Sequence, residues 1–193
     1  MNAMAVNQEY KRNKINPQKF AVWLACASIT MMFTALTSAY IVRQAGGNWL
    51  EFRLPGIFLA STMTIVASSI ALHGSFLAYK NGKEQLYKTL LLLGLALGFA
   101  FVITQYQGWV ALQNIGVPLK TNPSGDFVYA ISGLHAAHVL GGIVALIIGA
   151  IRAFSMPFKV TERRKLRQEM TLTYWHFVDL LWVYLFALLT LYS

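Results

Sequence analysis

The sequence is short of charge. Asp, Glu, Lys and Arg make up 12% of its 193 residues, about half of the roughly 25% that is usual in soluble domains. Only seven residues are acidic, whereas hydrophobic residues reach 56% of the chain. These proportions exclude a large aqueous domain and indicate a membrane protein.

Cysteine and several common motifs are also missing. Cys26 is the only cysteine, which excludes a disulfide or a thiolate metal cage within this chain. The sequence has no Cys-x-x-Cys-His motif for covalent haem attachment. It also has no glycine-rich loop of the kind that holds phosphate groups.

Long hydrophobic runs are what the sequence does have. Five segments are near or above the roughly 20 residues that a membrane-spanning helix needs. They predict an all-α fold, a polytopic membrane helical bundle with five transmembrane helices in one domain over residues 20–193. A polar and basic segment, residues 1–19, precedes it, and Thr161 is a candidate cap for a helix that extends the last span at its start. The predicted spans are approximately 20–42, 55–79, 89–112, 127–151 and 172–192.

Basic residues are divided unequally between the two sides that these spans define. The positive-inside rule places the richer side in the cytoplasm, so we expect a cytoplasmic N-terminus and a C-terminus on the opposite side. The net charge of +9 then reflects topology and does not indicate a nucleic-acid partner. The richer side holds Lys11, Arg12, Lys14, Lys19, Lys80, Lys83, Lys88, Arg152, Lys159, Arg163, Arg164, Lys165 and Arg167, and the other side holds Arg43, Arg53 and Lys120.

Ionisable side chains are few within the spans, and the last span holds His176 and Asp179. Such groups are costly in hydrocarbon and are normally buried against other helices. His176 and Asp179 are three residues apart and share one face of a helix. His138 of the fourth span should lie near the middle of the membrane, as should Asp179, so we expect a buried contact between His138 and Asp179.

Each span also carries a narrow stripe of small or polar residues, and transmembrane helices usually pack along such stripes. In the second span the stripe contains Thr62, Ser69 and His73. In the third span Gly94 and Gly98 form a step that allows close helix approach. The whole stripe of the third span is Gly94, Gly98, Gln105 and Gly108.

Four histidines raise the question of a metal or a haem. His135 and His138 are spaced i, i+3, which can place two imidazoles on one metal. However, the fourth span has no Cys, Asp or Glu to complete a ligand shell. His73 and His176 lie at similar depths in their helices and could face each other. A self-contained bis-histidine haem b electron carrier is therefore one alternative for this chain.

Three motifs resemble a known family. Residues 174–182, Tyr-Trp-His-Phe-Val-Asp-Leu-Leu-Trp, strongly resemble the last-helix signature of subunit III of haem–copper respiratory oxidases. Residues 133–142 and 105–109 resemble two further motifs of the same family. Order and spacing agree from about residue 17 to the C-terminus. The length is similar to the short, five-helix bacterial form of cytochrome c oxidase subunit III.

The resemblance implies a subunit of a terminal oxidase of aerobic respiration in the bacterial cytoplasmic membrane. There, cytochrome c oxidation is coupled to oxygen reduction and proton pumping. Subunit III of that family has no redox centre, packs on the catalytic subunit I, stabilises it and holds phospholipids, while haem and copper belong to partner subunits. Subunit II, a small subunit IV and a cytochrome c reductase in a supercomplex are further partners. Subunit III of a quinol oxidase is a second alternative, because it shares these motifs.

Residue counts agree with this assignment. The catalytic subunit of the family needs six histidine ligands, and this chain has four histidines. We therefore assign no catalytic, cofactor-binding or metal-binding residue to it. The candidates for structural, lipid or subunit contacts are His73, Gln105, His135, His138, Trp175, His176, Asp179 and Trp182.

Some family features are absent. Ser28 is followed by Ile29 where many members have glutamate, and Gly108 replaces the glutamate of the third span. His73 stands where relatives often have a carboxylate, which makes it a candidate proton-exchanging group because histidine exchanges protons near neutral pH. We expect the first two spans to present their Thr and small-residue stripes to subunit I.

Overall fold

The computed structural model describes residues 16–192, which form five α-helices and no strand. Every helix is long and apolar enough to cross a membrane, so the predicted all-α fold with five transmembrane helices is confirmed. Most of the predicted N-terminal segment, residues 1–15, lies outside the described residues. The helices are α2 (Pro17–Ala45), α3 (Ile57–Lys80), α4 (Glu84–Asn114), α5 (Pro123–Ser155) and α6 (Glu162–Tyr192).

Two helices begin with the same local signal. The Asn16 side chain accepts a hydrogen bond from the Gln18 N–H at 3.0 Å, and the Asn122 side chain accepts one from the Ser124 N–H at 2.9 Å. A proline follows each asparagine, at the helix position where a missing N–H costs nothing. The asparagine caps satisfy N–H groups that would otherwise lack partners.

Two helices end with the same glycine motif. Gly82 after α3 and Gly116 after α4 have φ values of 70° and 85°, in the left-handed region that glycine adopts at little cost. After α3, the Lys83 N–H donates to the Ala78 carbonyl at 3.0 Å, the long-range bond of a Schellman motif. This motif reverses the chain so that α4 starts within a few residues of the end of α3.

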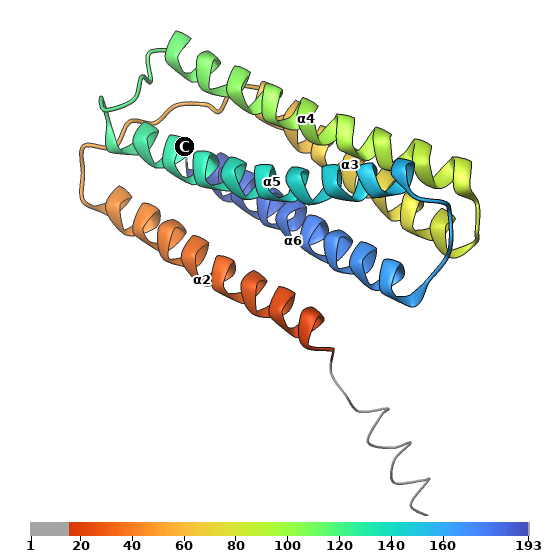
Figure 1. Ribbon diagram of the computed structural model, residues 1–193. Helices are drawn as coiled ribbons and strands as arrows, with labels where there is room; N and C mark the ends of the chain where they lie inside the picture. Colours follow the sequence, from red (N-terminus) through yellow and green to blue (C-terminus); the bar gives the residue numbers. More distant parts are fainter. Residues whose placement is uncertain (1–15, 193) are drawn as a thin grey trace, which may run out of the picture.

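The helices α3 and α4 pack closely along their lengths, because small residues lie between them. A Cβ added to Gly94 would lie 2.5 Å from the Leu72 side chain, and the Ser68 hydroxyl donates to the Gly94 carbonyl at 2.7 Å. The predicted close approach at Gly94 is thus realised, with α3 as the partner. Among the described helices α2 contacts only α5 and α6, and it lies at one side of the bundle (Figure 1).

Successive helices run in opposite directions, so the connections between them alternate between the two ends of the bundle (Figure 1). The α3–α4 and α5–α6 connections lie at the end where α2 begins. The α2–α3 and α4–α5 connections lie at the other end, together with the end of α6. The described basic residues of the richer group therefore gather at one end, hereafter the basic end. The orientation of that end in a membrane stays a prediction.

Candidate functional site

His176 links α6 to α3 through two hydrogen bonds. Its Nδ1 shares a short hydrogen bond with the Ser69 hydroxyl, and its Nε2 lies 3.3 Å from Nδ1 of His73. The two imidazole centroids are 5.5 Å apart. His73 and His176 therefore face each other, which their similar depth in the sequence had made possible. Ser69 and His73 reach the same imidazole because residues four apart lie on one face of a helix.

Asp179 lies one turn further along α6 and is half-buried. The Ser69 side chain lies near the carboxyl group. Asp179 Oδ1 is buried and has no hydrogen-bond partner among residues 16–192. Ser69 thus stands beside both ionisable residues of the last span.

The predicted contact between His138 and Asp179 is wrong. His138 Nδ1 lies 2.7 Å from the Leu134 carbonyl of its own helix, and its ring stands edge-on to Phe33 of α2 with centroids 5.6 Å apart. Asp179 instead lies on the side of α6 that faces α3. Equal depth in the membrane did not imply contact, because the two helices are rotated so that these side chains point to different neighbours.

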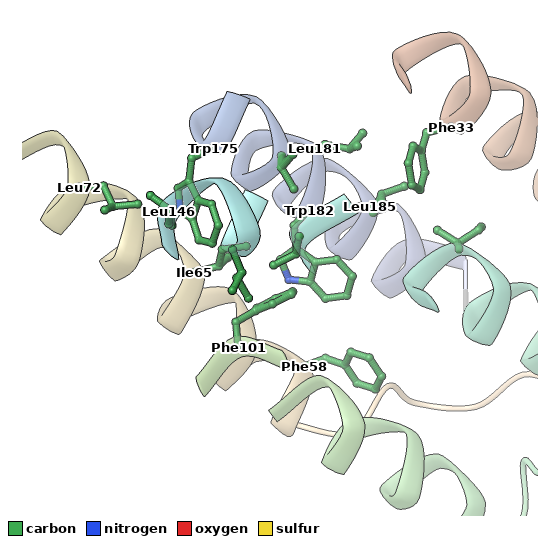
Figure 2. Close-up of a cluster of buried hydrophobic side chains, with 14 of the residues drawn as sticks. Phe33, Phe58, Ile65, Leu72, Phe101, Leu146, Trp175, Leu181, Trp182 and Leu185 are labelled. Carbon is green, nitrogen blue, oxygen red and sulfur yellow. The ribbon is translucent and has the colours of Figure 1, made fainter. Parts of the chain in front are cut away.

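His135 and Trp182 form the aromatic centre of the bundle. His135 is completely buried, and its ring lies over Trp182 with centroids 4.9 Å apart. Phe101 of α4 meets both rings edge-on, and Phe33 of α2 meets His135. Figure 2 shows Trp182 reaching from α6 toward Phe101 and Phe58. Its indole N–H donates to the Thr62 hydroxyl at 3.0 Å, which joins α6 to α3.

Trp175 fills a slot between two glycines. A Cβ added to Gly98 of α4, or to Gly142 of α5, would lie 2.9 Å from the indole ring. The ring is 1% exposed, and it points inward from α6 in Figure 2. The Gly94–Gly98 step of α4 therefore serves two neighbours, with Gly94 against α3 and Gly98 against α6.

Gln105 and His135 are buried without hydrogen bonds to the part of the chain that the structure describes. Both amide atoms of Gln105 and both ring nitrogens of His135 lack a partner there. Their contribution to the contacts between these helices is packing. His135 does this directly, since its ring touches aromatic side chains from three other helices.

The histidines do not assemble into a metal or haem site. Residues 16–192 contain no group of three or more His, Cys, Asp or Glu that could hold a metal ion. The ring of His135 packs on Trp182, whereas that of His138 turns to Leu134 and Phe33. A bis-histidine haem would lie between its two axial ligands, but His73 and His176 are in direct contact. The haem b alternative does not fit this geometry.

Several contacts between helices involve residues that the sequence did not single out. The Tyr174 hydroxyl donates to the His138 carbonyl at 3.0 Å, and the Trp109 N–H donates to the Ser132 hydroxyl at 2.9 Å. Lys19 of α2 pairs with Glu169 of α6 at 2.8 Å. Tyr and Trp combine an apolar body with a polar tip that usually finds a hydrogen-bond partner when it is buried. This property was the only indication in the sequence of the Tyr174 and Trp109 contacts.

Five membrane-spanning helices packed around His135 and Trp182 define an integral membrane helical bundle. A family model described as "Cytochrome c oxidase subunit III" matches residues 19–193. The chain belongs to the cytochrome c oxidase subunit III family. It is therefore a subunit of the cytochrome c oxidase complex of the respiratory chain, and it assembles with other subunits of that oxidase.

Curated relatives cover most of the chain. The chain is 30% identical to "Probable cytochrome c oxidase subunit 3" of Nocardia farcinica over 172 residues, which are 86% of this chain and 82% of that protein. It is 28% identical to "Cytochrome c oxidase subunit 3" of Thermostichus vulcanus over 194 aligned residues, which are 97% of this chain and 92% of that protein. It is 26% identical to the Synechocystis protein of that name, over 89% of this chain and 74% of that protein.

Proposed function

We propose that this chain is a non-catalytic subunit III, without a redox centre, that packs on subunit I of a bacterial cytochrome c oxidase and stabilises it. The observation that carries the proposal is that two polar side chains of its signature helix, His176 and Trp182, are hydrogen-bonded to α3 of the same chain. His176 is bonded to Ser69 and His73, and Trp182 is bonded to Thr62. Side chains fixed in this way form a rigid neighbour for a catalytic subunit.

The face that meets subunit I is on α2 in this proposal. Only 17% of the apolar window of α2 is buried in the chain, the lowest share among the five helices. The hydroxyls of Thr30 and Thr34 donate to carbonyls of their own helix at 2.9 and 2.8 Å. They can therefore face an apolar neighbour without an unsatisfied group. The large exposed side chains of α2 include Phe20, Trp23, Leu24, Met31 and Val42.

The stripe of α3 was also expected to face subunit I, but two of its residues are engaged within this chain. Thr62 and Ser69 turn toward α6, where they bond to Trp182 and His176. Polar groups in hydrocarbon are stable where another helix satisfies them, and here the satisfying helix belongs to the same chain. We therefore assign the contact with subunit I to α2 alone.

Cytochrome c is the proposed electron donor of the complex, and the names of the relatives support it over quinol. Haem and copper would belong to the partner subunits. Contacts with subunit II, with a small subunit IV and with a cytochrome c reductase stay predictions. So do coupling to proton pumping and a location in the bacterial cytoplasmic membrane.

The test compares the purified oxidase with and without this chain. We expect the isolated chain to show no Soret band. We expect the oxidase that lacks it to start at a normal rate and to lose activity within fewer turnovers. A Soret band stoichiometric with the isolated chain would contradict the proposal, as would equal operating lifetimes.

His73 is the proposed proton-exchanging group within this role. Its side chain is exposed and also bonded to His176, so it connects the surface of α3 with the interior. In the assembled oxidase, His73→Leu should lower proton uptake and shorten operating lifetime. The matched variant His138→Leu should have neither effect, because His138 is bonded to its own helix. Unchanged proton uptake and operating lifetime in His73→Leu would contradict a proton-exchanging role for His73.

A further inference from the structure

A group of polar side chains lies along the contact between α3 and α6, which we call the α3–α6 seam. It consists of Ser69 and His73 from α3 and of His176 and Asp179 from α6. Ser69 is buried, whereas His176 and Asp179 are partly exposed and His73 is exposed. The seam therefore brings three ionisable residues to the surface of the bundle within its membrane-spanning helices.

The surface beside these residues is apolar and uncovered. Ile70, next to Ser69 on α3, is 69% exposed, and Leu180, next to Asp179 on α6, is 71% exposed. Val183, one turn after Asp179, is also exposed. None of the five described helices covers this surface, so in a membrane it meets either lipid or another chain.

The Asp179 carboxyl group has too few partners within its own chain. Its Oδ1 is buried and has no hydrogen-bond partner among residues 16–192. The neighbouring Ser69 hydroxyl has one hydrogen and already shares a hydrogen bond with His176, whereas a carboxylate can accept about four hydrogen bonds. Asp179 also has no cation partner in the described part of the chain. The ion pairs there use other carboxylates, those of Glu84, Glu162 and Glu169.

Lipid does not supply the missing partner at this depth. Asp179 lies seven residues after Leu172, where the apolar part of α6 begins, and this is about 10 Å at 1.5 Å per residue. Hydrocarbon chains carry no hydrogen-bond donor, and the bilayer core holds no water to replace one. Ionisable residues at such depths face a protein interior or a water-filled cavity and pair with one another. A second transmembrane helix can supply a donor and also cover the apolar surface.

We propose that the α3–α6 seam binds one transmembrane helix of a further oxidase subunit, and that a lysine or arginine of this helix pairs with Asp179. A basic side chain complements the charge of the carboxylate and supplies several donors at once. Ile70 and Leu180 pack against apolar side chains of the same helix. The inference rests on the proposed function, because it requires the chain to be assembled in an oxidase. It goes beyond that function, because the seam is separate from α2, which is the face assigned to subunit I.

The proposed contact leaves His73 at its edge. Helix α3 ends at Lys80 at the basic end, and His73 lies one turn closer to that end than Ser69, which stands beside Asp179. A helix that pairs with Asp179 therefore covers the deeper part of the seam. Proton exchange at His73 and helix binding at Asp179 can be tested separately for this reason.

The experiment places a photo-reactive amino acid at position 70 of this chain in the purified oxidase complex. We expect it to cross-link to a transmembrane segment that carries a lysine or arginine within about one turn of the cross-linked residue. The control position is Ile103, which is 58% exposed on α4 and not part of the seam, and it should not cross-link to that segment. Cross-linking of position 70 to lipid alone would overturn the inference. Cross-linking to a segment without a basic residue, or to subunit I, would also overturn it.

Substitutions then test the charge pair. Asp179→Asn keeps the shape of the side chain and removes its charge, so it should lower the yield of the cross-link from position 70 about tenfold. Thr190→Val is the control on the same helix, because Thr190 is exposed and bonds to the Phe186 carbonyl of α6, and it should leave the yield unchanged. Equal yields in Asp179→Asn and the unaltered chain would contradict the pairing.

A double-variant cycle completes the test. Replacing the basic residue of the identified helix with glutamine should lower the yield about as much as Asp179→Asn does, and the two changes together should add little further loss. Independent, fully additive losses would overturn the pairing. If Asp179→Asn does not fold, the cross-link of the unaltered chain still decides. A complex that contains this chain without a cross-link at position 70 contradicts this inference alone, whereas a chain that does not join the complex contradicts the proposed function.

Discussion

Trp182 donates its indole N–H to Thr62 at the centre of the bundle, and the Thr62 hydroxyl in turn donates to the Phe58 carbonyl at 2.8 Å. No water is present in the hydrocarbon core to replace such a partner. The free energy at stake is nevertheless modest, because measured hydrogen bonds between membrane helices average about 0.6 kcal/mol. At the residue scale, these bonds fix the rotation of the helices more than they add to total stability.

Replacing Thr62 with valine preserves shape and removes the acceptor of the Trp182 N–H. We expect Thr62→Val to lower the free energy of unfolding by about 1 kcal/mol, because a buried donor is left unpaired. The measurement is unfolding of the purified chain in mixed micelles with increasing dodecyl sulfate. Thr64→Val is the control: Thr64 is on the same helix, is exposed, and bonds only to the Ala60 carbonyl of its own helix. Equal losses in both variants would contradict the proposed role of the Trp182–Thr62 bond.

The helix with the fewest contacts to the others is α2. Besides the hydrogen bonds of Thr37 and Tyr40 to α6, a buried aromatic contact and an ion pair hold it. Phe33 is completely buried and meets His135 and His138 of α5 with centroids 6.4 and 5.6 Å away. Lys19 pairs with Glu169 of α6, but about 40% of each side chain is exposed. Exposed ion pairs are usually worth about 0–1 kcal/mol. Packing at Phe33 is therefore the stronger attachment of α2.

Two variants separate these contacts. Phe33→Ala should cost about 3 kcal/mol, in line with other buried Phe→Ala changes, and should speed hydrogen exchange along α2 more than along α4. Glu169→Gln should cost less than about 1 kcal/mol and leave the exchange pattern unchanged. Hydrogen exchange of the full chain in nanodiscs, followed by mass spectrometry, measures the exchange rate of each helix separately. Faster exchange of α2 in Glu169→Gln than in Phe33→Ala would show that the ion pair attaches α2 more strongly than Phe33 does.

The existence of each helix could be predicted from the sequence, because length and hydropathy are properties of one segment. The ends were less predictable. The last helix starts at Glu162, ten residues before the predicted start at 172, because its first turns are charged and give no hydropathy signal. Thr161 did mark this start, as its hydroxyl accepts a hydrogen bond from the Arg164 N–H at 3.4 Å.

The rotation of each helix about its axis could be predicted only in part. His73 and His176 face each other, an arrangement that their similar depth allowed but did not require. His138 and Asp179 were wrongly paired from depth alone. The cavity that lies among α3, α4, α5 and α6, lined by Leu72, Leu91, Leu146 and Leu172, was not predicted, because the relative positions of four helices are a tertiary property.

At the scale of the whole molecule, the up-and-down path of five helices turns a pattern of charge along the chain into two unlike ends. The basic end carries Arg152, Arg164 and Arg167 and the lysines of the α3–α4 connection, whereas the opposite end has Arg43, Arg53 and Lys120. An odd number of helices also puts the start of α2 and the end of α6 at opposite ends. The positive-inside rule predicts from this asymmetry that the basic end faces the cytoplasm.

Reporter fusions test this orientation directly. Alkaline phosphatase fused after residue 193 should be active, because the positive-inside rule places the C-terminus outside the cytoplasm, where the disulfides of the reporter can form. The same reporter inserted at Gly82, in the α3–α4 connection, should be inactive. As a control, replacing Lys80, Lys83 and Lys88 with glutamine should increase activity of the Gly82 fusion, since it weakens the charge difference. Activity at Gly82 without activity at the C-terminus would contradict the predicted topology and place the basic end outside the cytoplasm.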